Sequence, residues 1–164
     1  MSDVTIKLKI NGKAREVSTL ARKSLADMLR EDVNLTSVHL GCEQGVCGAC
    51  TVLVDGLPVR SCLTLAAACE GVEIVTIEGL HGDDTARLKA EFSKENALQC
   101  GFCTAGMLLT GHELICRREE MTRDQICTAM SGNICRCTGY NGIVRAIQTA
   151  NAQGMEAEHS GAVA

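Results

Sequence analysis

The chain has 164 residues, of which 46% are hydrophobic and only 2% aromatic, and its formal net charge is −4. That length allows one ordinary domain or two small ones. Acidic and basic residues are spread along the chain, so no basic patch indicates a nucleic-acid partner. No apolar run approaches the ~20 residues of a membrane span, and the N-terminus lacks a signal-peptide pattern. We therefore expect a cytoplasmic protein, unless a partner carries an export signal.

Residues 1–77 have the pattern of a small mixed β-sheet crossed by one helix. Polar and apolar residues alternate over 4–18 around an Asn-Gly pair, which is the strongest short hairpin signal. Ser24 then stands where a helix N-cap is expected. A second hairpin is predicted around a later Asp-Gly pair, and 72–77 is predicted to be the closing strand.

The pattern changes after this strand. A segment rich in Gly, His and Asp predicts a linker at 78–83. Thr122, followed three residues later by Gln, has the spacing of a capping box. Residues 84–153 are predicted to form an all-α domain of four helices, and 154–164 a frayed polar tail. The predicted helices are 84–95, 103–117, 122–131 and 140–152. The fold class is therefore predicted as α+β, with a sheet domain followed by a four-helix bundle.

Eleven cysteines are unusual for a chain of this length. A disulfide framework is one interpretation, but the number is odd, and only one residue separates Cys135 from Cys137. In a reducing compartment, clustered cysteines more often bind a metal. Three cysteines lie outside the clusters, and we predict that they are buried free thiols packing as small hydrophobic groups. These are Cys69, Cys116 and Cys127.

The first four clustered cysteines follow the pattern C-x4-C-x2-C, with a fourth thiol after eleven further residues. That spacing is typical of a plant-type [2Fe–2S] site, whereas structural zinc usually takes two short C-x2-C-like pairs. Glycines between them permit tight turns and let backbone N–H groups approach sulfur. The pattern favours a [2Fe–2S] cluster, with zinc as the alternative. The predicted ligands are Cys42, Cys47, Cys50 and Cys62.

The second group combines C-x2-C at Cys100 and Cys103 with C-x-C at Cys135 and Cys137. Taken alone, C-x2-C leaves a redox dithiol, a zinc knuckle and a cluster open. We expect Cys103 at the start of one helix and Cys137 just before another, so that two helix N-termini face one anionic centre. A second [2Fe–2S] cluster is predicted, and zinc remains open on spacing alone.

The segments GCEQGVCGACTVLVDG, QCGFCTAGM and GNICRCTGY closely resemble the iron–sulfur portion of the xanthine oxidase family of molybdenum hydroxylases. The resemblance spans about residues 3–150. Within it, 1–77 resembles a plant-type ferredoxin domain, which has a β-grasp fold. The family commonly has Pro where this chain has Ala105, and Ala can occupy the same helical turn.

The resemblance implies an electron-transfer small subunit of a molybdenum hydroxylase or dehydrogenase. The first cluster would lie nearer FAD on a medium subunit, and the second nearer a molybdopterin cofactor on a large subunit. Gln99 would contact the pterin, and Cys100 would lie near it. The family implies a dimer of heterotrimers. A stand-alone ferredoxin-like carrier or redox sensor is the alternative, and a structural zinc protein is a third interpretation.

No nucleophile–base arrangement, P-loop or dinucleotide motif is present in the sequence. We therefore predict no catalytic residue on this chain. The substrate pocket would lie on the large subunit, so this sequence does not name the substrate.

Overall fold

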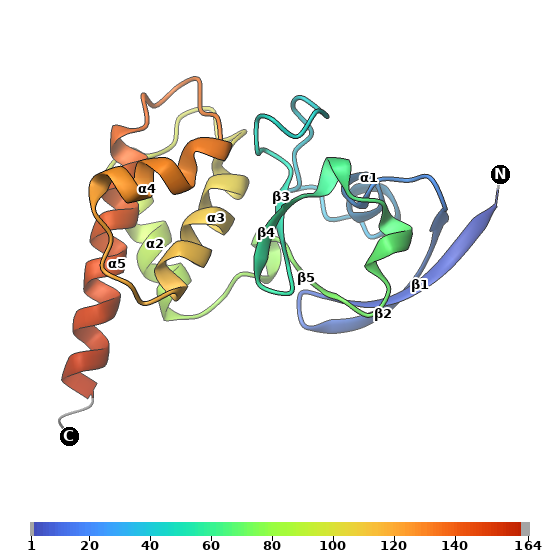
Figure 1. The fold of residues 1–164 in the computed structure, drawn as a ribbon, viewed down its shortest axis with the longest axis horizontal. Coiled ribbons are helices and arrows are strands. Elements are labelled where there is room, and N and C mark those ends of the chain that lie inside the picture. Colours follow the sequence, from blue (N-terminus) through green and yellow to red (C-terminus); the bar gives the residue numbers. More distant parts are fainter. Residues whose placement is uncertain (1, 162–164) are drawn as a thin grey trace.

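The computed structural model describes residues 2–161, and the side chains of residues 2–157. A sheet part and a helical part lie side by side, with the N-terminus at the far edge of the sheet (Figure 1). The strands are β1 (Asp3–Ile10), β2 (Lys13–Leu20), β3 (Thr51–Val54), β4 (Leu57–Arg60) and β5 (Glu73–Val75). The main helices are α2 (Asp83–Lys94), α3 (Thr104–Cys116), α4 (Arg123–Ala129) and α5 (Asn141–Gly161). This order confirms the predicted α+β class.

The five strands form one mixed sheet in the order β2-β1-β5-β3-β4. β1 and β5 run parallel, and the other neighbours are antiparallel, which is the arrangement predicted for a β-grasp domain. Asn11 and Gly12 both have positive φ, 52° and 75°, as a type I′ hairpin turn requires. The predicted first hairpin is therefore confirmed.

One short helix packs on this sheet. It begins as α1 (Leu25–Asp27) and continues as a π-helical turn over Met28–Asp32. The Ser24 hydroxyl accepts the Asp27 N–H at 3.1 Å, which confirms the predicted N-cap. The helix side chains facing the sheet are fully buried and form the core with aliphatic residues of β1, β3 and β5.

The closing strand is shorter than the predicted 72–77. β5 ends at Val75, and a 3-10 turn follows over Ile77–Gly79. The reason lies in Thr76, whose N–H donates to the Asn11 side chain at 2.9 Å instead of to a strand. The first hairpin turn therefore ends the last strand.

The helical part packs α2, α3, α4 and α5 around an aliphatic core that includes Leu88, Met107 and Ile147. The capping box at Thr122 and Gln125 is present as predicted. Within residues 2–161, no helix is long and apolar enough to cross a membrane.

The predicted end of the last helix, at 152, was wrong. α5 runs to Gly161, through residues that the sequence predicted to be frayed. Gly154 is buried, and a Cβ there would lie 3.1 Å from an Arg118 nitrogen and 3.3 Å from an Arg87 nitrogen. The helix therefore packs beside these two arginine side chains beyond its predicted end.

The two parts share an apolar contact at their junction. Leu53 of β3, Leu80 and Leu109 of α3 form a small buried cluster, against which Val75 and Ile77 also pack. Leu80 lies in the segment 78–83 and is only 4% exposed. The connection between the sheet and the helices is therefore held by packing.

Candidate metal centres

The first cysteine group lies on the loop before β3 and just after β4. The β3–β4 hairpin turns the chain back, so that the Ser61 hydroxyl donates to the Cys50 carbonyl at 2.6 Å. Cys62 therefore lies beside Cys50. Gly45 has a φ of +77°, and a Cβ there would lie 2.5 Å from the Leu63 side chain. Glycine adopts this φ without strain and leaves room for the Leu63 side chain beside the loop.

The four thiols of this group form two contacting pairs. Cys42 Sγ accepts the N–H groups of Cys47 at 3.3 Å and Gln44 at 3.4 Å. These backbone donors, with Cys47 first, lower the pKa of Cys42 to about 6. Burial is the main cause, and the hydrogen bond with the Cys50 thiol the second, that raises the pKa of Cys62 to about 11. Cys42 thus pairs with Cys47, and Cys50 with Cys62.

The second cysteine group lies at the N-terminus of α3 and on the loop before α5. Cys103 is the N-cap residue of α3, as predicted, and α5 begins four residues after Cys137. The Cys100 and Cys137 sulfurs are 3.5 Å apart. Burial, and then contact with Cys135, raises the pKa of Cys103 to about 12. This group therefore also consists of two pairs, Cys100 with Cys137 and Cys103 with Cys135.

Neighbouring polar groups hold the buried Cys135. The Thr138 hydroxyl donates to Cys135 Sγ at 3.1 Å, and the Tyr140 hydroxyl accepts the Cys135 N–H at 3.0 Å. Although burial opposes it, hydrogen bonding from Thr138 lowers the pKa of Cys135. A thiolate at this position is stabilised before any metal is considered.

The paired arrangement fits a binuclear cluster. Two sulfurs on one tetrahedral metal, each at about 2.3 Å, lie roughly 3.7 Å apart, close to the 3.5 Å between Cys100 and Cys137. Each group offers two thiol pairs, the number that the two irons of a [2Fe–2S] unit would take.

Exposed apolar residues lie close in sequence to both thiol groups. Val46 and Leu63 are neighbours of ligands predicted for the first cluster. Leu98, Phe102, Ile134 and Tyr140 lie within three residues of cysteines of the second group and are 40–47% exposed. Gln99 and Cys100 are also exposed. Exposed apolar residues of this kind mark surfaces that meet another protein.

The three remaining cysteines do not share one environment. Cys69 is buried, as predicted, whereas Cys116 and Cys127 are exposed, so the prediction for these two was wrong. Cys116 is the last residue of α3, and its sulfur lies 3.4 Å from His112 Nε2. Cys127 follows the buried Ile126 on α4 and lies on the outer side. Helical position, not residue type, decided their burial.

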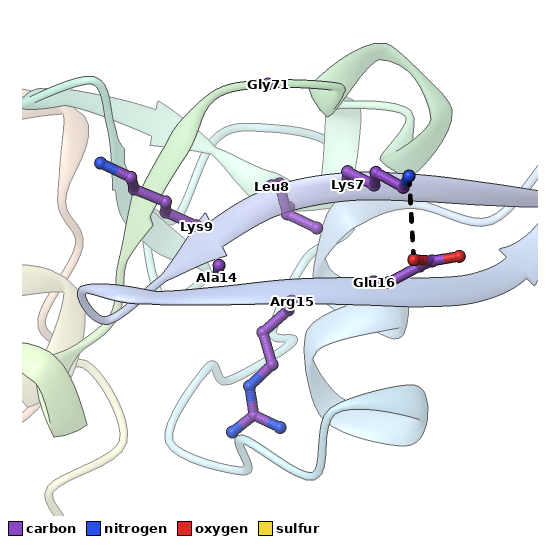
Figure 2. Close-up of a pocket in the computed structure, with 7 residues that line it drawn as sticks. All are labelled: Lys7, Leu8, Lys9, Ala14, Arg15, Glu16 and Gly71. Carbon is purple, nitrogen blue, oxygen red and sulfur yellow. Dashed lines mark ion pairs between the residues drawn. The ribbon is translucent and has the colours of Figure 1, made fainter.

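A separate hollow of about 560 Å³ lies on the β1–β2 hairpin (Figure 2). Lys7 Nζ faces Glu16 across it at 4.0 Å, and both side chains are largely exposed. No cysteine lines this hollow, so it is unrelated to the candidate metal centres.

Sequence reasoning missed the polar residues that join the two cysteine loops. Arg60, Thr51, Thr110 and Asn133 form hydrogen bonds between them. The sequence feature that could have indicated this contact was the pair Gly132-Asn133, which lies just before Ile134 and Cys135. A single sequence does not show which segment such a side chain faces.

The fold and the thiol pairs define a two-domain iron–sulfur protein of the electron-transfer class. Comparison with known proteins supports each half. A family model described as "2Fe-2S iron-sulfur cluster binding domain" matches residues 8–75, and one described as "[2Fe-2S] binding domain" matches residues 76–148.

Known relatives match over most of their length. The chain is 50% identical to the nicotine 6-hydroxylase small subunit of Paenarthrobacter nicotinovorans, over 92% of this chain and 91% of that protein. It is 46% identical to the nicotinate dehydrogenase small FeS subunit of Eubacterium barkeri, over 92% of this chain and 96% of that protein. The crystal structure of quinoline 2-oxidoreductase from Pseudomonas putida 86 contains a chain with 48% identity and a TM-score of 0.87, covering 94% of this chain and 97% of that one. The chain belongs to the iron–sulfur small subunits of the xanthine oxidase family of molybdenum hydroxylases.

Proposed function

We propose that this chain passes single electrons between a molybdopterin centre on a large subunit and FAD on a medium subunit. The observation that carries this proposal is the presence of two separate groups of paired thiols in one chain. The proposed ligands of the first cluster are Cys42, Cys47, Cys50 and Cys62. Those of the second are Cys100, Cys103, Cys135 and Cys137.

Each [2Fe–2S] cluster, when bound, accepts and releases one electron at a time. The chain's own groups tune that exchange by their hydrogen bonds to sulfur. The Gln44 and Cys47 N–H groups at Cys42, and the Thr138 hydroxyl at Cys135, offset negative charge on the ligands. Such donors raise a reduction potential. Burial of Cys50 and Cys135 limits the access of water to each site.

The exposed apolar residues near the second group support a bound partner. Leu98, Phe102, Ile134 and Tyr140 would be costly to expose on a free electron carrier. We propose that the large subunit covers this face, that Gln99 contacts the pterin through its amide, and that Cys100 lies near it. These apolar residues argue against the stand-alone ferredoxin alternative.

We propose further that the complex is a dimer of heterotrimers in the cytoplasm. The domain boundaries proposed are 1–77 and 84–153, with 78–83 between them and 154–164 following. The relatives named above act, by their names, on nicotine, nicotinate and quinoline. A nitrogen heterocycle is therefore our proposal for the substrate of the large subunit.

Purification of the complex through a tag on this chain tests the proposal. We expect two larger chains to co-purify, with roughly four iron atoms and four acid-labile sulfides per chain, as two [2Fe–2S] clusters require. Zinc in place of iron, or a loaded chain that purifies alone, would contradict it.

The variant Gln99→Ala tests the pterin contact separately. We expect it to alter the molybdenum EPR signal and to weaken retention of the large subunit, with both clusters still loaded. Gln148→Ala, at an exposed Gln on α5, is the control. Equal behaviour of the two variants would remove Gln99 from the pterin site.

A further inference from the structure

The two cysteine loops meet along one edge of the molecule, between the sheet part and the helical part, where the loop before β3 stands beside the start of α3 (Figure 1). The Ile134 N–H donates to the Cys47 carbonyl at 2.8 Å. Cys47 belongs to the first thiol group, and Ile134 directly precedes Cys135 of the second. This hydrogen bond therefore connects the backbones of two proposed ligands that belong to different clusters.

Asn133 holds both sides of that hydrogen bond. Its side chain is buried, with 3% of the residue exposed. Asn133 Nδ2 donates to the Gly48 carbonyl at 3.2 Å, and Asn133 Oδ1 accepts the Thr110 hydroxyl at 3.1 Å. Gly48 follows Cys47, and Asn133 precedes Ile134. Asn133 therefore holds Gly48, the neighbour of the accepting Cys47, close to Ile134, whose N–H donates the hydrogen bond.

The junction leaves no room for another arrangement. A Cβ on Gly48 would lie 2.6 Å from the Gly132 carbonyl, and a Cβ on Gly106 would lie 2.2 Å from the Gly48 carbonyl. Arg60 closes the outer side, donating to the Gly132 carbonyl and to the Thr51 hydroxyl. A buried polar network whose members are satisfied in this way is rigid.

We propose that Asn133 is a positioning residue for electron transfer between the two clusters. The route runs from Cys47 Sγ along its Cβ, Cα and carbonyl, across the hydrogen bond to Ile134, and along the backbone to Cys135 Sγ. An electron tunnels more readily through bonds and a short hydrogen bond than across a gap of equal length. Asn133 maintains that short contact, although it touches neither cluster.

This inference rests on the proposed function, because it needs both clusters in place. The test compares Asn133→Ala with Asn151→Ala in the assembled complex. Asn151 is a matched control: it is also a buried Asn, and its Nδ2 donates to the Glu119 carbonyl at 2.8 Å, within the helical part. Iron content, the potential of each cluster, and the spin–spin splitting between the two reduced clusters are measured beside the rate of electron redistribution after pulsed reduction.

We expect Asn133→Ala to slow redistribution relative to both the wild type and Asn151→Ala. The spin–spin splitting should change, whereas iron content and both potentials should match those of Asn151→Ala. Equal rates in two fully loaded variants would overturn the inference and leave the proposed function intact. A wild-type complex without two cluster signals would overturn both.

A milder variant decides the matter if Asn133→Ala does not assemble. Thr110→Val keeps the shape of Thr110 but removes the hydroxyl that donates to Asn133 Oδ1. Slower redistribution with both clusters loaded supports the positioning role. An unchanged rate and unchanged splitting overturn it.

Discussion

Gly48 offers a direct test of how closely the two cysteine loops pack. Its φ of +72° is in the left-handed region, where another residue costs about 1–2 kcal/mol. A Cβ would also lie 2.6 Å from the Gly132 carbonyl and 2.7 Å from Asn133 Nδ2, and such overpacking typically costs about 1–3 kcal/mol. Gly48→Ala should therefore reduce the free energy of unfolding by about 2–5 kcal/mol in total.

Gly12→Ala separates the two contributions. Gly12 has a similar φ of +75°, but no atom lies within 4 Å of the position that its Cβ would take. This variant should lose only the backbone part, about 1–2 kcal/mol. The two variants are compared in the assembled complex by measuring the loss of visible iron–sulfur absorbance as the urea concentration rises. Equal shifts of the bleaching midpoint, with iron retained in both, would refute the close contact between the loops.

Three further predictions concern single side chains. Burial lowers the pKa of His112, so the unfolded chain binds more protons just below the ordinary pKa and stability rises with pH there. Between pH 7.5 and 5.5, His112→Gln should therefore lose less thermal stability than the wild type, and equal losses in both would contradict this. Cys137→Ser should abolish or distort one of the two cluster EPR signals and spare the other, and equal loss of both would argue against independent sites. Tyr140→Phe removes the acceptor of the Cys135 N–H, a loss of about 1 kcal/mol that should appear as faster iron release to a chelator; unchanged release would show that this bond does not hold the loop.

Local signals in the sequence predicted most of the elements correctly. The Asn-Gly hairpin, the Ser24 cap and the capping box at Thr122 each depend on residues only a few positions apart. Cysteine spacing likewise predicted the two thiol groups, because a loop that wraps a cluster fixes the distance between ligands along the chain. These features needed no knowledge of tertiary packing.

The errors arose where distant residues decided the outcome. β5 stops at Val75 because Thr76 bonds to Asn11, more than sixty residues earlier in the chain. α5 continues past residue 152, where Gly154 packs beside Arg87 of α2 and Arg118 of the segment after α3. Asn133 was missed for the same reason, since its partners Gly48 and Thr110 are remote in sequence.

The junction between the two parts combines an apolar and a polar contact, and each meets a different physical requirement. Leu53, Leu80 and Leu109 bury aliphatic surface, which stabilises the contact without fixing the direction of any group. The cysteine loops have no regular secondary structure, so their buried carbonyls need donors from elsewhere.

Asn133 and Arg60 supply these donors, to the Gly48 and Gly132 carbonyls respectively. An apolar residue of similar volume in place of Arg60 would remove this donor from the Gly132 carbonyl, at a cost of about 1–3 kcal/mol. The Gly48 carbonyl would lose Asn133 but keep the N–H and the hydroxyl of Thr51 as donors. The polar side chains at this buried contact thus link two loops that lack regular secondary structure, and the hydrogen bonds of Asn133 and Arg60 join the loop of one thiol group to that of the other.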